Sequence, residues 1–86
     1  MANTVFSQKI TIDGIDREFV FQQSFFGNEL MYYIEVNDDY DKLTFRMVWN
    51  DNKRQWKVAP QVLPAWVFEN EFTFNNIIEQ DLGERK

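Results

Sequence analysis

The chain has 86 residues, of which 44% are hydrophobic and 17% aromatic, and it carries a net charge of −5. This length suits one domain with a single core, and the mixed composition favours a folded globule over disorder. Histidine and cysteine are both absent, which removes the commonest general base, the thiol nucleophile and the usual zinc ligands.

The first predicted strand covers about residues 4–12, where apolar and polar side chains alternate with a period of two. Residues 13–16 read Asp-Gly-Ile-Asp and supply turn chemistry. A second strand follows this turn. Its predicted inward face carries Phe19, Phe21, Gln23 and Phe25.

Gly27 and Asn28 form a two-residue hairpin signal, because both residue types reach positive φ at little cost. Pairing about this turn keeps the inward residues of both strands on one face, so the turn and the hydrophobic pattern agree. The expected cross-strand pairs are Phe25 with Leu30, Gln23 with Tyr32, Phe21 with Ile34, and Phe19 with Val36.

A third strand is predicted over about residues 30–36, a fourth over about 43–49 and a short fifth near 56–58. Turns rich in Asn and Asp separate them at residues 37–42 and 50–53. Because every connection is tight, the chain should form a five-stranded antiparallel meander in the order 1-2-3-4-5.

One C-terminal helix is predicted over about residues 64–82, packed across one face of the sheet in an α+β fold. Pro60 ends the last strand, Pro64 suits a first helical turn, and Gly83 offers a left-handed cap. The charges at the two ends complement the helix dipole: Glu69 and Glu71 lie early, and Arg85 and Lys86 follow the end.

The predicted inward face is larger than one helix can cover. Three arrangements could hide the remainder: the sheet curls around the helix, two chains pack together, or a groove stays open for a ligand. The inward positions are Phe6, Ile10, Ile12, Phe19, Phe21, Phe25, Leu30, Tyr32, Ile34, Val36, Leu43, Phe45, Met47, Trp49, Trp56 and Val58.

Four central positions, Phe21, Ile34, Phe45 and Phe72, should be nearly fully buried, because they lie in the middle of their elements on inward faces. Gln23 is a polar member of the inward row. Its amide should therefore either hydrogen-bond Tyr32 or face a solvated groove.

Metal and cofactor chemistry finds little support in the chain. Asn37, Asp39 and Asp41 begin a calcium-loop pattern, but Lys42 replaces the required glycine and Val48 the bidentate glutamate. No glycine-rich phosphate loop is present. We therefore expect no metal and no cofactor.

An enzyme is also disfavoured. No histidine is available to activate Ser7 or Ser24. Glu69 and Glu71 lie two positions apart and point to different sides of a helix, and solubility accounts for these acids together with Glu79 and Asp81.

Residues 49–57 read W-N-D-N-K-R-Q-W-K and interleave basic with aromatic side chains, as single-stranded nucleic acid sites do. The alternation nevertheless points both tryptophans inward, and the acidic body of the chain opposes a phosphate backbone. Basic residues on an edge strand also deter aggregation. Nucleic acid is therefore disfavoured as a partner.

The outward face offers a more specific candidate, a small apolar centre with charged residues around it. Such a composition is typical of protein-binding patches, in which Tyr, Met and Arg are enriched. Scattered surface apolar residues are also ordinary on strands. We call this candidate the outer patch; it consists of Val20, Met31, Tyr33, Arg46 and Val48.

The sequence thus favours a small acidic, non-enzymatic protein-interaction or inhibitor-like domain, whose partner is another protein or a second copy of the chain. The alternative is a domain that binds a small molecule or an anionic ligand between sheet and helix, in a cavity formed by Gln23, Tyr32, Trp49 and Trp56. The N-terminus lacks the features of a secretory signal and no apolar run could span a membrane, so we expect a cytoplasmic protein without a membrane partner.

Overall fold

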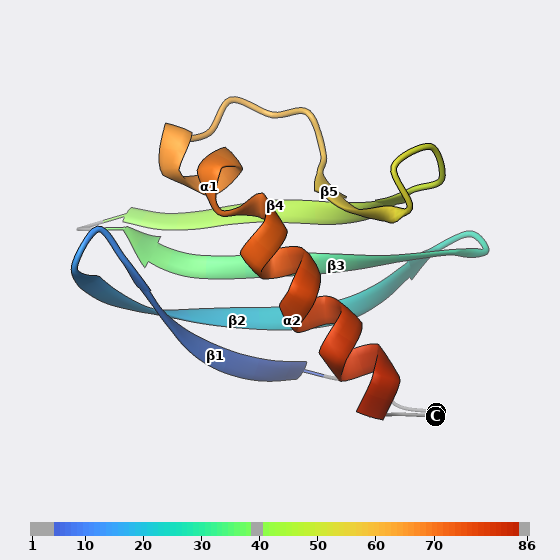
Figure 1. Cartoon of the computed structure of the whole chain (residues 1–86), viewed down its shortest axis with the longest axis horizontal. Coiled ribbons are helices and arrows are strands. Elements are labelled where there is room, and N and C mark those ends of the chain that lie inside the picture. The colour runs from blue at the N-terminus through green and yellow to red at the C-terminus, as the bar shows by residue number, and fades with distance from the viewer. Residues whose placement is uncertain (1–4, 39–40, 85–86) are drawn as a thin grey trace.

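The structure, a computed structural model, describes residues 5–38 and 41–84. It shows one five-stranded antiparallel sheet in the order β1-β2-β3-β4-β5, which confirms the predicted meander and α+β class. The sheet curls into a half-barrel with both helices on its concave side (Figure 1). The elements are β1 (Val5–Ile12), β2 (Ile15–Phe26), β3 (Glu29–Asp38), β4 (Asp41–Asn50), β5 (Gln55–Val58), α1 (Ala65–Glu69) and α2 (Glu71–Glu84).

Two tight turns set the register of the first three strands. Asp13 and Gly14 have φ values of 54° and 78°, and two successive positive values are the requirement of a type I′ hairpin. Gly27 has a φ of 64° in the next turn. The four cross-strand pairs predicted for β2 and β3 are all present, so the predicted register is confirmed.

The core lies between the concave face and the helices. Of the predicted central residues, Phe21, Ile34 and Phe45 are at most 1% exposed, as expected. Two members of the predicted inward row do not belong to the core, because they lie at the end of the sheet where β2 and β4 finish. They are Phe25, which is 63% exposed, and Trp49, which is 39% exposed.

The predicted continuous helix is wrong, because it is broken at Asn70 into α1 and α2. Asn70 has φ −107° and ψ 15°, outside the helical range. Its side-chain Nδ2 donates to the carbonyl oxygen of Trp66 at 2.7 Å. This local bond competes with helix continuation, as asparagine commonly does.

The burial predicted for Phe72 is also wrong, since this side chain is 65% exposed. The core-facing side of α2 is defined by Phe74 and Ile78, which are fully buried. A residue two positions before Phe74 lies about 200° around the helix and therefore faces solvent.

Gly83 does not cap the helix as predicted, because α2 continues through it to Glu84. Its φ is not positive, so it needs no left-handed conformation. Arg85 and Lys86, expected at the negative end of the helix dipole, lie outside the described residues.

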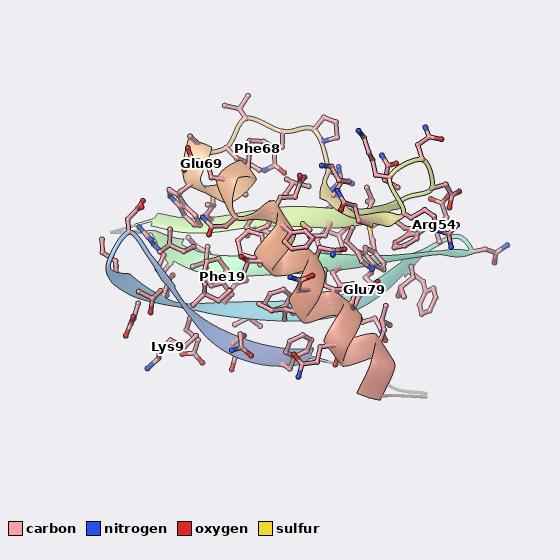
Figure 2. The ribbon with its side chains drawn as sticks, viewed as in Figure 1. Lys9, Phe19, Arg54, Phe68, Glu69 and Glu79 are labelled. Atoms are coloured by element: carbon pink, nitrogen blue, oxygen red, sulfur yellow. The ribbon has the colours of Figure 1, made fainter. Side chains whose placement is uncertain are left out.

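Aromatic packing joins the helices to the sheet. The Phe74 ring lies 5.3 Å from Phe19 and 5.5 Å from Phe45, measured between centroids (Figure 2 labels Phe19). Trp66 of α1 makes an edge contact with Phe19, and the Arg17 guanidinium lies 4.6 Å from the Trp66 ring centroid. These contacts pack α1 and α2 against the sheet.

The free edge of β5 is covered by side chains of α2. The Trp56 amide donates to Oδ1 of Asn75 at 2.7 Å, and the Val58 amide donates to Oε2 of Glu71 at 2.7 Å. The other carboxylate oxygen of Glu71 pairs with Nζ of Lys57 at 2.6 Å. The helix thus satisfies two edge amides that would otherwise be available to another strand.

Candidate functional site

The outer patch lies on the convex face of the sheet, opposite both helices. Tyr33 is directly opposite Arg46 in the β3–β4 register. Tyr33 is 39% exposed and Arg46 is exposed. The structure thus brings together an aromatic ring and a guanidinium that a partner could contact.

The apolar members of the outer patch are less accessible than the sequence indicated. Met31 is only 6% exposed, so its expected role as a presented side chain is wrong. It lies opposite Ser24 of β2 and Val48 of β4, at the end of the β3–β4 register. Val20 and Val48 are half-buried. The accessible part of the patch is therefore centred on Tyr33 and Arg46.

Acidic residues flank the patch on one side. Glu18 and Glu35 line a shallow hollow of about 200 Å³ together with Val20. The Glu35 carboxylate also pairs with Nζ of Lys42 at 3.4 Å, and both side chains are about half exposed or more. Such a surface pair contributes little to stability, so these charges are available to shape recognition.

The ligand cavity predicted between sheet and helix is largely occupied. Tyr32 is fully buried, and its hydroxyl accepts from Nε2 of Gln23 at 3.1 Å and donates to Oδ2 of Asp81 at 2.9 Å. Of the two arrangements expected for Gln23, the structure has the hydrogen bond to Tyr32. Asp81, a third member on α2, was not predicted. Because these polar groups bond one another, the chain itself fills most of the expected cavity.

The two tryptophans of the predicted cavity have different surroundings. Trp56 is 4% exposed, and its Nε1–H donates to Oε2 of Glu79 at 3.1 Å (Glu79 is labelled in Figure 2). Trp49 contacts Trp56 edge-on with 5.8 Å between ring centroids. Its Nε1–H donates to Oδ1 of Asp51 at 2.7 Å, and part of the indole stays exposed.

Trp49 and Trp56 also line a cleft at the end of the sheet. The β3–β4 register ends at Met31 and Val48, whereas the two flanking hairpins continue beyond it. The β2–β3 and β4–β5 turns consequently lie apart at the right of Figure 1. We call the resulting space, about 340 Å³, the end cleft; it is lined by Glu29, Leu30, Met31, Val48, Trp49, Asp51 and Trp56.

Three of the acidic residues in the helical region, Glu71, Glu79 and Asp81, bond to the sheet. Glu71 accepts a hydrogen bond from the Val58 amide and forms an ion pair with Lys57. Glu79 and Asp81 accept hydrogen bonds from the side chains of two buried aromatic residues. These bonds tie α2 to the sheet. This role was not predictable from sequence, because the partners lie far away along the chain.

Among residues 5–38 and 41–84, no three acidic side chains are grouped closely enough to hold a metal ion. Asp39 of the incomplete calcium pattern lies outside the described residues. In the same part of the chain, no helix has the length and apolar character needed to cross a membrane.

Comparisons with known proteins provide no further guide. No family model, curated protein or solved structure matches this chain. Function is therefore inferred from the geometry alone.

Proposed function

We propose that this chain is a small, non-enzymatic protein-interaction domain, of inhibitor-like character, that binds its partner through the outer patch. The observation that carries the proposal is the Tyr33–Arg46 cross-strand pair. Both side chains are accessible on the convex face, and both described helices lie on the concave face (Figure 1). Tyrosine and arginine are, together with tryptophan, the residue types enriched among interface anchors.

The end cleft supports a basic partner. It carries the carboxylates of Glu29 and Asp51 beside the accessible indole of Trp49, and none of the described residues that line it is basic. A lysine or arginine side chain would gain both ion pairing and a cation–π contact there. Because Met31 and Val48 belong to both the cleft and the outer patch, one partner could engage both sites.

The overall charge supports the same partner class. A net charge of −5 attracts basic proteins over long range, and it makes association fast and sensitive to salt. The alternative, a ligand held between sheet and helix, has weaker support. Its predicted lining residues Tyr32 and Trp56 are buried and bonded to the α2 carboxylates.

The test is capture of partners from native lysate by the wild-type domain and by a Tyr33→Ala/Arg46→Glu double variant. The variant should fold normally, because both side chains are accessible. It should weaken binding of the captured partner by at least about tenfold, as loss of an interface anchor does.

The matched control is a Phe72→Ala/Lys86→Glu variant, which makes the same kinds of change at the exposed Phe72 of α2 and at the last residue of the sequence. It should leave the affinity unchanged. Equal losses for both double variants would show that net charge, rather than the outer patch, decides binding. An unchanged affinity for the outer-patch variant would refute the proposed site.

A further inference from the structure

The two edges of the sheet differ in a way that points to a second interface, separate from the outer patch. The β5 edge is covered by Asn75 and Glu71 of α2. At the opposite edge, β1 pairs with β2 along all eight of its residues without a bulge (Figure 1). Among the described residues, no side chain accepts a hydrogen bond from a β1 amide, and Nε2 of Gln8 donates to the neighbouring Lys9 carbonyl oxygen at 3.5 Å.

The β1 sequence also lacks the usual protection of an edge strand. It contains no proline and a single charged residue, Lys9. Natural edge strands avoid pairing by means of prolines, bulges, charges or a covering element. An eight-residue strand with one charge is therefore open to pairing.

The hairpin geometry determines which backbone groups face this open edge. Ile12 and Ile15 close the two-residue turn, so they form a hydrogen-bonded pair. Even-numbered β1 residues then bond to β2, and odd-numbered residues point their amides and carbonyls outward. The outward set is Val5, Ser7, Lys9 and Thr11.

We propose that the β1 strands of two copies pair antiparallel about a two-fold axis, which joins the two half-barrels into one ten-stranded sheet. The outward-facing amides and carbonyls of the two β1 strands can hydrogen-bond to each other only in a register that places odd-numbered residues opposite odd-numbered residues. Two such registers each pair seven of the eight residues. One register places Lys9 opposite Lys9 of the second copy, where the two like charges repel each other. The other register places Gln8 at the two-fold axis.

The register centred on Gln8 is self-complementary. Ser7 lies opposite Lys9 of the second copy, and Phe6 lies opposite Ile10. Phe6 and Ile10 both belong to the inward row on the concave face, and each is only half-buried in the single chain. Because the axis repeats the contact, two apolar pairs become buried in an isologous interface.

The first test measures mass in solution by light scattering. The wild-type chain should have twice its 10.4 kDa chain mass, and a Ser7→Pro variant should be monomeric. Proline at this position removes an edge-facing amide and leaves the β1–β2 bonds intact. The matched Ser7→Ala variant should remain dimeric. A wild-type monomer at about 100 μM would overturn the proposal.

The second test does not depend on how well the proline variant folds. The chain has no cysteine, so Gln8→Cys introduces a unique thiol at the axis. Facing residues in such a non-hydrogen-bonded pair have Cα atoms about 4.5 Å apart, within the range that disulfides span. Gln8→Cys should therefore form a covalent dimer under mild oxidation.

Thr11→Cys is the control, because in this register Thr11 lies opposite Val5 of the second copy and not opposite that copy's Thr11. It should cross-link far more slowly than Gln8→Cys. Equal rates for the two variants, or a faster rate for Ser7→Cys, would overturn the register. Loss of partner binding in the outer-patch variants has no bearing on either test, so the two proposals can fail separately.

Discussion

Phe74 and Phe72 of α2 provide a direct test of how the helix packs on the sheet. Phe74 is fully buried between the rings of Phe19 and Phe45, whereas Phe72 is 65% exposed. The same substitution to alanine at both positions therefore removes the same atoms from two different surroundings. Any difference in stability reports burial, since both residues lie in the same helix.

The expected magnitudes follow from the two environments. Removal of a buried phenylalanine side chain costs about 3–5 kcal/mol, which includes the cavity left behind. The Phe72→Ala change should cost less than about 1 kcal/mol, and the better helix propensity of alanine offsets part of that loss. A chain of this length has a total stability of only about 4–13 kcal/mol, so Phe74→Ala should remove a large share of it.

Urea titration followed by circular dichroism measures both variants. With a slope of about 1–3 kcal/mol/M, Phe74→Ala should lower the unfolding midpoint by about 1 M or more. Phe72→Ala should leave the midpoint nearly unchanged. Similar losses for the two variants would refute the orientation of α2, and a larger loss for Phe72→Ala would reverse it.

Three further outcomes are expected in the same assay. Phe45→Ala should cost about 3–5 kcal/mol, and a loss below about 1 kcal/mol would contradict its place in the core. Asn75→Ala should cost about 1–3 kcal/mol, because the buried Trp56 amide loses its acceptor, and an effect below about 0.5 kcal/mol would show that another group replaces it. Tyr32→Phe should cost about 1 kcal/mol through its lost hydroxyl bonds, and an unchanged midpoint would mean that these bonds add no net stability.

Local patterns were sufficient to predict the sheet. Alternation of apolar residues identifies the strands, and the turn at Gly27 sets the β2–β3 register, because a two-residue loop leaves one choice of pairing. The same register placed Gln23 beside Tyr32, and the separate pairing of β3 with β4 places Tyr33 opposite Arg46. These features depend on residues close together in the chain or on a pairing that a short turn dictates.

The C-terminal region was predicted less well, because its pattern is compatible with several helix orientations. Apolar residues occur over more than half of the helix circumference, so periodicity alone could not decide between Phe72 and Phe74 as the core residue. The side-chain bond of Asn70 to Trp66 then interrupts the helix that the pattern predicted as continuous.

The accessible surface was decided by tertiary structure alone. Strand alternation places Met31 on the outward face and Trp49 on the inward face, yet Met31 is only 6% exposed and Trp49 is 39% exposed. Both residues lie at the end of the sheet, where the β2–β3 and β4–β5 hairpins diverge. Likewise, Asn75 and Glu71 cover the β5 edge only because α2 crosses the sheet beside it. Strand identity and register follow from neighbouring residues, whereas exposure and edge protection depend on which distant element packs nearby.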